Sequence, residues 1–200
     1  MKTDVNSLSH FMRRWLEKAN DVVDSTDSAF VDRFVFTYIS FNALYTAAAN
    51  ILDGSSSDIV KWDFRKGGPP KRQFKKYQTE QRRATTLVVD VIGKHRSVEH
   101  LVICKDAIEN LCNCFGPGRL YLHELESGEP DIARDDALIA SARSGNIESL
   151  LGIVYLLRCN LFHGAKALSA VQDVPLMAAT AILQTLIPPF LAGIERRLQA

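Results

Sequence analysis

The 200-residue sequence lacks several features that mark special classes of protein. No apolar run reaches the roughly 18 residues needed to cross a bilayer, and the N-terminal stretch MKTDVNSLSHFMRRW lacks the apolar centre of a secretory signal. There is no internal repeat, no low-complexity tract and no clear alternating strand pattern. We therefore expect a cytoplasmic protein with no membrane partner, folded as a single domain over residues 1–200.

Cysteine is also scarce, with four residues in the chain. Without an export signal, these cysteines are expected to be reduced thiols. Cys112 and Cys114 could be combined with Cys104 and His100 in a metal site, but their spacing differs from that of a zinc knuckle and no second pair follows. No carboxylates cluster at metal-ligand spacing near the motif described below. We expect neither a metal nor a cofactor.

The net charge of +1 conceals an uneven distribution of charge along the chain. Residues 61–83 carry nine basic side chains against only Asp63 and Glu80, whereas residues 124–136 carry six acidic side chains against Arg134. A local excess of positive charge attracts a polyanion even when the total charge is near zero. The basic segment is therefore a candidate phosphate-binding track, with a solvated helix face as the alternative.

Apolar residues recur with the period of an α-helix through most of the chain. A recurring stripe of this kind is typical of a helix face that packs in a core. The sequence therefore predicts the fold class all-α, as a bundle of four or five main helices with extra short helices. The expected helices span residues 5–23, 28–52, 71–95, 97–115, 135–145, 146–163 and 169–199, the last with a kink at Pro188 and Pro189.

One apolar helical stretch, residues 150–166 with the sequence LLGIVYLLRCNLFHGAK, carries several polar groups near its end. The residues expected to face the core are Leu150, Val154, Leu157 and Leu161. Arg158 then falls on the edge of this stripe, and His163 lies about 140° away around an ideal helix. The two side chains can meet if His163 occupies a frayed helix end closed by Gly164, or if two copies of the helix pack about a two-fold axis.

Either arrangement combines a guanidinium, an imidazole that titrates near neutrality and the amide of Asn160. These groups can hold a phosphodiester and move a proton next to it. The alternative is structural. Arg158 would then tie helix ends together, and His163 would cap carbonyl groups at a helix C-terminus.

The order of these residues resembles the signature of HEPN domains, an all-α family that includes many metal-independent endoribonucleases. Arg158 is followed after four residues by His163 and then by glycine, with Asn160 between them. In the family the polar residue usually follows the arginine directly, whereas Cys159 has that position here. The segment 36–45, FTYISFNALY, is similar to the first long helix of HEPN proteins from prokaryotic defence systems. The helical bundle implied by the resemblance agrees with the pattern of the rest of the chain.

The resemblance implies cleavage of RNA, in anti-phage defence or as a toxin, by attack of a 2′-hydroxyl on the adjacent phosphate. Arg158 would hold the developing negative charge, His163 would move the proton, and Asn160 would orient either the histidine or the phosphate. Such a reaction needs no metal. DNA lacks the 2′-hydroxyl and should resist cleavage.

The implied partners are RNA, a second copy of the chain in a homodimer, and an antitoxin or defence-system protein. Phe74 and Tyr77 are available to stack on unpaired bases. The residues expected to bind the RNA backbone are Lys71, Arg72, Lys75, Lys76, Arg82 and Arg83. The alternatives are a non-catalytic HEPN module that dimerises or binds a nucleotide or a partner enzyme, and a purely structural helical adaptor.

Overall fold

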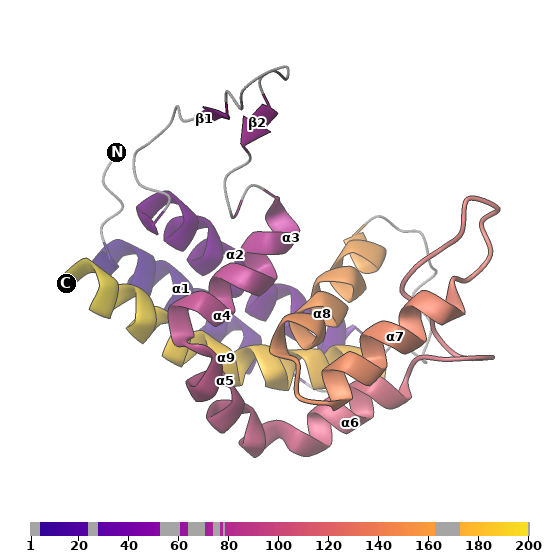
Figure 1. The fold of residues 1–200 in the computed structure, drawn as a ribbon. Helices are drawn as coiled ribbons and strands as arrows, with labels where there is room; N and C mark the ends of the chain where they lie inside the picture. The colour runs from indigo at the N-terminus through magenta and orange to yellow at the C-terminus, as the bar shows by residue number, and fades with distance from the viewer. Residues whose placement is uncertain are drawn as a thin grey trace.

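A computed structural model describes residues 5–23, 28–52, 61–63, 71–73, 77, 79–162 and 173–199, and this part of the chain confirms the all-α fold (Figure 1). A π-helical segment η1 (Arg83–Leu87) and a 3₁₀ turn η2 (Val102–Cys104) interrupt the helical series. The α-helices are α1 (Val5–Asn20), α2 (Ala29–Leu52), α3 (Glu80–Arg82), α4 (Val88–Ile92), α5 (Lys94–Leu101), α6 (Lys105–Asn113), α7 (Ile132–Arg143), α8 (Ile147–Phe162) and α9 (Asp173–Gln199).

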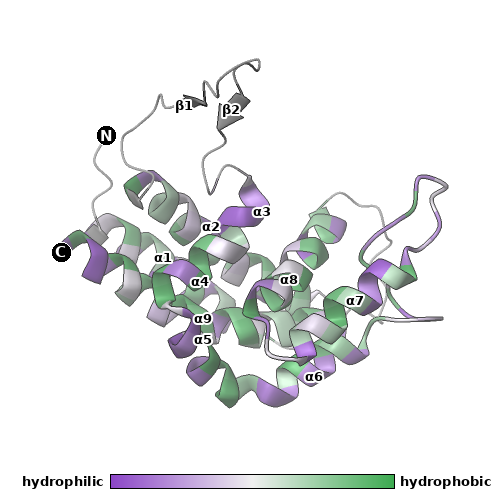
Figure 2. Ribbon diagram, in the orientation of Figure 1, coloured by the Kyte–Doolittle hydropathy of each residue, from purple (hydrophilic) through white to green (hydrophobic). Residues whose placement is uncertain are grey.

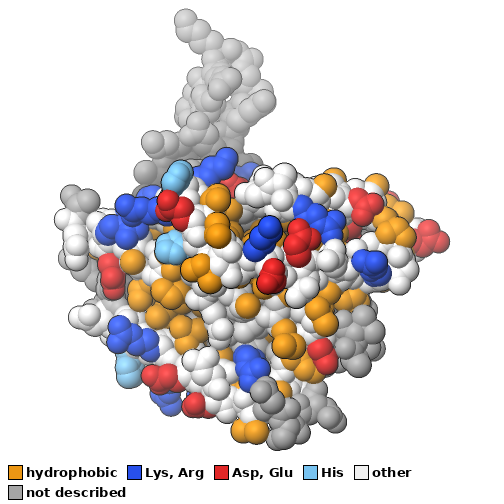
Figure 3. Space-filling view, turned by 90° about the horizontal axis from the view of Figure 1, so that it is seen from below, with side chains coloured by type: hydrophobic (Ala, Val, Ile, Leu, Met, Phe, Trp, Pro, Cys, Tyr) orange, Lys and Arg blue, Asp and Glu red, His pale blue; other side chains and the backbone are white. Residues whose placement is uncertain are grey.

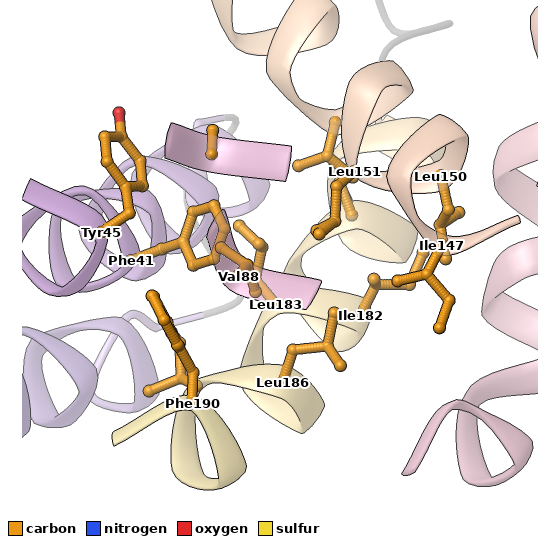
Figure 4. Packing of buried hydrophobic residues seen from close by; sticks show 14 of the residues in the cluster. Phe41, Tyr45, Val88, Ile147, Leu150, Leu151, Ile182, Leu183, Leu186 and Phe190 are labelled. Carbon is orange, nitrogen blue, oxygen red and sulfur yellow. The ribbon is translucent and has the colours of Figure 1, made fainter. Parts of the chain in front are cut away.

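The last helix, α9, lies at the centre of the packing and contacts α2, α4, α5 and α6. Its inward side chains Ile182, Leu186 and Phe190 are each 0% exposed. Figure 4 shows them gathered with side chains from α2 and α8, and the rings of Phe41 and Phe190 have centroids 6.3 Å apart. The helix continues through its prolines to Gln199, although proline removes a backbone donor.

By length and composition, α9 could cross a membrane, which corrects the expectation that the chain has no apolar stretch of that length. Within its most apolar 18-residue window, 56% is buried against other parts of the protein. Core helices that are hydrophobic on most sides have the same composition. The position of α9 in the fold accounts for its apolar character.

The single helix expected over residues 71–95 was wrong in its first half. Residues 71–73 form β2, which pairs antiparallel with β1 (Lys61–Asp63), and α3 begins only at Glu80. The hydroxyl of Thr79 accepts a hydrogen bond from the N–H of Arg82 at 3.2 Å. A cap of this kind fixes a helix start, whereas a run of basic residues does not. The hydrophilic α3 then leads into the hydrophobic α4 (Figure 2).

The next helix begins at Lys94 and not at Ser97, as the sequence had suggested. Gly93 has a φ of +95°, a conformation that other residues rarely adopt, and it separates α4 from α5. Ser97 is buried inside α5, where its hydroxyl donates to the carbonyl of Gly93 at 3.0 Å. The turn η2 divides the helix expected over residues 97–115 into α5 and α6.

The start and the buried face of α8 agree with the sequence-based prediction. The side-chain oxygen of Asn146 accepts the N–H of Ser149 at 3.1 Å, as expected of an N-cap. Leu161 is partly buried. The fully buried members of the predicted core stripe are Leu150, Val154 and Leu157, at 2%, 1% and 7% exposed.

Replacing Gly193 with alanine is expected to lower the free energy of unfolding by about 1–3 kcal/mol. A Cβ at this position would lie 2.7 Å from both the carbonyl oxygen and Cγ1 of Val91, because α9 and α4 approach closely there. The matched control is Gly152→Ala in α8, whose Cβ would lie 3.7 Å from Leu138 Cδ1. In that variant the free energy of unfolding should rise by up to about 1 kcal/mol, because alanine has a higher helix propensity than glycine. Urea unfolding measures both, and a loss of stability in both variants would contradict the packing.

Candidate functional site

Arg158 lies at the edge of the buried face of α8, where the sequence predicted it. Its side chain is 22% exposed. The guanidinium carbon lies 5.4 Å from the centre of the Tyr38 ring, on α2, and 5.1 Å from that of Phe162, the last residue of α8. Aromatic faces attract a cation and hold the planar group in place. Two helices therefore fix the position of this charge.

Glu80, the first residue of α3, faces the same guanidinium. Its Oε1 lies 3.5 Å from Nη2 of Arg158 and accepts a hydrogen bond from the hydroxyl of Tyr45 at 2.9 Å. The segment η1 that follows α3 contacts both α2 and α8, which places α3 at the junction of these helices. Figure 4 shows the Tyr45 hydroxyl pointing away from the hydrophobic cluster. The site thus contains a carboxylate that the sequence analysis did not place there.

The guanidinium of Arg158 has more hydrogen-bond donors than partners. Its Nε is buried and forms no hydrogen bond within the described part of the chain. Among the described residues, the hydrogen-bond partner of Nη1 is the sulfur of Cys159, a weak acceptor, at 4.0 Å. The 3.5 Å separation from Glu80 exceeds that of a strong charge-assisted hydrogen bond. Because buried polar groups are normally paired, these donors can accommodate an additional anion.

The charge states of the site follow from burial and from its neighbours. Burial lowers the pKa of Arg158, but Cys159, Tyr38 and Glu80 together outweigh this effect and raise it above its ordinary value. Burial also raises the pKa of Tyr38 and of Tyr45, and in Tyr38 the Tyr45 hydroxyl and the Arg158 charge act in the opposite direction. At neutral pH Arg158 is therefore a cation and both phenols are neutral.

The free energy of unfolding is expected to fall as pH rises from 10 towards about 12. Burial, followed by the neighbouring Cys159 thiol, raises the pKa of Tyr155 to about 12, whereas a tyrosine in the unfolded chain ionises near pH 10. A raised pKa in the folded state gives stability that is complete below the unfolded pKa and is lost as pH passes the folded one. Urea unfolding at several pH values measures the slope. Tyr155→Phe should reduce it, and an unchanged slope would contradict this assignment.

Asn160 is turned away from Arg158. It lies two residues further along α8, about 200° around the helix. Its amide donates to the carbonyl of Leu122 at 3.3 Å. His163 and the glycine after it lie outside the described residues, so the meeting of His163 with Arg158 stays a prediction. The structure brings Arg158 together with Glu80 and does not bring it together with Asn160.

The residues expected to bind an RNA backbone do not lie on one helix. Lys71 and Arg72 belong to β2, and their side chains are outside the described part of the structure. Lys75 and Lys76 also lie outside it. A continuous basic helix face over this segment, as the sequence suggested, is therefore wrong.

The other predicted RNA contacts differ from one another in exposure. Arg82 is exposed on α3, whereas Arg83 is half-buried and its Nε donates to the carbonyl of Tyr77 at 3.0 Å. Tyr77 is only 9% exposed, and its hydroxyl donates to Asp90 at 2.6 Å. Tyr77 therefore does not present a free ring for base stacking, which corrects that expectation. Phe74 is outside the described residues.

A second polar cluster, which the sequence analysis missed, joins His123 to Asp135. Asp135 is 0% exposed, and its Oδ1 lies 2.7 Å from Nδ1 of His123. The same carboxylate accepts the backbone N–H groups of Leu122 and His123 at 2.6 and 3.1 Å. These bonds fasten the segment before α7 to the helix itself. Asp135 stands in an acidic run beside the exposed Asp136, so nothing in the sequence distinguished it.

Within the described ranges, no three His, Cys, Asp or Glu side chains are grouped so that they could hold a metal ion. The four cysteines are free thiols. The functional groups that the structure places around Arg158 are the carboxylate of Glu80, the phenols of Tyr38 and Tyr45 and the thiol of Cys159.

Comparisons of the chain with protein-family models, with curated proteins and with solved structures found no match. The similarity to HEPN domains rests on the residues of the Arg158 motif and on residues 36–45, and it stays a prediction.

Proposed function

We propose that this protein is a metal-independent endoribonuclease of the HEPN type, in which Arg158 binds the phosphate that is attacked. The observation that carries the proposal is the half-buried guanidinium, whose Nε has no hydrogen-bond partner among the described residues. The planar donors of arginine match the oxygens of a phosphate. A phosphate bound to Arg158 would accept hydrogen bonds from the guanidinium donors that Glu80, 3.5 Å away, leaves without a partner.

In the proposed reaction, an RNA 2′-hydroxyl attacks the adjacent phosphorus, and the bond from phosphorus to the 5′-oxygen of the next nucleotide breaks. His163 takes the proton of the attacking hydroxyl, and a proton is delivered to the leaving 5′-oxygen. The products are a 2′,3′-cyclic phosphate and a 5′-hydroxyl. Arg158 stabilises the negative charge that develops on the phosphate oxygens.

One neighbour of Arg158 supports this assignment. The ring of Phe162 lies against the guanidinium and is 52% exposed, so it can stack on a base next to the bound phosphate. The Glu80 carboxylate is 43% exposed, so it can turn to the solvent when a phosphate takes its place beside Arg158. Asn160 makes no contact with the phosphate in this proposal, because its amide is bonded to Leu122.

The proposal includes a homodimer with the motif helices at or near the interface, and an antitoxin or defence-system protein as a further partner. Exposed hydrophobic side chains at the start of α9, the helix that follows the motif in the chain, support an interface there. They are Val174 and Met177, at 51% and 57% exposed. A second copy could cover them and bring its own His163 and Arg158 into the same cleft.

The test is to incubate the purified full-length protein with an RNA and with a DNA of the same sequence, in the presence of a chelator. We expect the protein to cut the RNA and not the DNA. The cut RNA should end in a 2′,3′-cyclic phosphate, which end-group analysis identifies. Cleavage that the chelator abolishes, or equal cleavage of DNA, would contradict the mechanism. RNA that binds without being cut would favour the non-catalytic module.

A further inference from the structure

A pocket of about 230 Å³ opens where α5 and α6 meet the turn between α7 and α8. Its inner walls are formed by Leu101, Ile147 and Leu150, which are 7%, 5% and 2% exposed. The volume accommodates roughly eight groups of the size of a water molecule in the liquid. The pocket lies at the start of α8, at the opposite end of that helix from Arg158.

The mouth of the pocket is also apolar. Val98 and Val102 line it and are 45% and 69% exposed, and the neighbouring Ile103 is 83% exposed. Figure 3 shows hydrophobic side chains, in orange, reaching this side of the surface among charged ones. Single exposed valines are common, but here they continue inward to buried leucines. An apolar path therefore leads from the surface to the core.

Among the charged side chains at the rim, Lys105 differs from the others. Nε of Arg143 lies 3.6 Å from Glu109, and its Nη2 donates to Asn113 at 2.6 Å. Lys105, the first residue of α6, has no ion pair or hydrogen bond with other described residues. The helix dipole does not compensate a cation at this end of a helix. The ammonium group of Lys105 is therefore the rim charge left to bind an anion.

We propose that this pocket binds a medium-chain monocarboxylate, with the alkyl chain against Leu101 and Leu150 and the carboxylate facing Lys105. Ligand sites are typically apolar concavities with a few polar groups that fix orientation. A ligand with one anionic end and an apolar body matches both parts of this site. The inference does not depend on RNA cleavage, because it uses no residue of the Arg158 site.

The first test is a calorimetric titration of the full-length protein with octanoate at low ionic strength, where saturable binding of one molecule per chain is expected. In a series from hexanoate to dodecanoate, affinity should rise by about fourfold for each added CH₂. The rise should stop once the chain fills the pocket. An affinity that keeps rising with chain length, or no saturable binding of any member, would overturn the proposal.

The second test separates the charge from the apolar wall. Lys105→Met keeps the aliphatic stem and should weaken octanoate binding by about fivefold while leaving octanol binding unchanged. Lys94→Met, at the exposed start of α5 and outside the pocket, should change neither. Equal effects of the two substitutions would refute the role of Lys105. The protein could instead fail to bind octanoate and form a dimer that Val102→Asp dissociates. That result would show that a second copy covers the pocket, and it would overturn the proposal.

Discussion

Arg158→Ala is expected to lower the rate of RNA cleavage by about 10²–10³-fold, the usual loss when one preorganised donor to a developing oxyanion is removed. The guanidinium is already held by contacts with the rings of Tyr38 and Phe162, so little reorganisation is needed when a phosphate arrives. Rates of single-turnover cleavage of a labelled RNA measure the effect. His163→Ala should cause a loss of similar size if the imidazole moves the proton.

Control variants show whether the loss of RNA cleavage comes from the missing guanidinium or from unfolding of the protein. Glu80 is 43% exposed and stays solvated without its partner, so Arg158→Ala should change the free energy of unfolding by less than about 1 kcal/mol. Arg158→Lys keeps the charge without the planar fork and should give an intermediate rate. Arg96→Ala, at an exposed position on α5, should cleave normally. Cleavage by Arg158→Ala at the rate of the unchanged protein would end the nuclease proposal.

Asp135→Ala is expected to lower the free energy of unfolding by about 3–5 kcal/mol, since each buried donor left unpaired costs about 1–3 kcal/mol. The carboxylate is 0% exposed and accepts the N–H groups of Leu122 and His123 as well as bonding the imidazole. The matched control is Asp136→Ala, one residue along α7 and exposed, which should stay within about 0.5 kcal/mol. Urea unfolding compares the two. Similar losses in both variants would show that general charge effects, and not these bonds, stabilise the segment.

The helices that form the core could be predicted because their apolar period is long and uninterrupted. Leu150, Val154 and Leu157 of α8 are buried as expected, and Arg158 lies at the edge of this face, where its position in the helical repeat placed it. Burial of one face stabilises such helices more than local propensity does. The sequence therefore predicted both the class of fold and the position of Arg158 at the edge of the buried face of α8.

The segment before α4 was misjudged because basic residues are compatible with helix, strand and loop alike. Its informative residue was Thr79, whose hydroxyl caps α3, and Gly93 marked the true end of α4. Both signals are local and could have been read. The prediction of one continuous helix over residues 71–95 followed the basic composition of the segment and did not use these two residues.

Two partners of Arg158, Tyr38 and Glu80, could not be predicted, because they come from helices distant in the sequence. Glu80 reaches the guanidinium only because η1 packs between α2 and α8. In the same way, the turn of Asn160 towards Leu122 depends on how residues 114–131 fold back over α8. Spacing along one helix fixes the direction of a side chain but not what meets it.

The π-helical segment between α3 and α4 sets the rotational phase of Glu80. Segments of this kind arise when a helix gains a single residue, and the ordinary α-helical form is recovered when that residue is lost. A one-residue deletion within Arg83–Leu87 would therefore leave α4 in the core but rotate α3 by about 100° about the helix axis. Glu80 would then leave Arg158 without any substitution at either position. The length of this short segment therefore decides whether the carboxylate lies in the site or outside it.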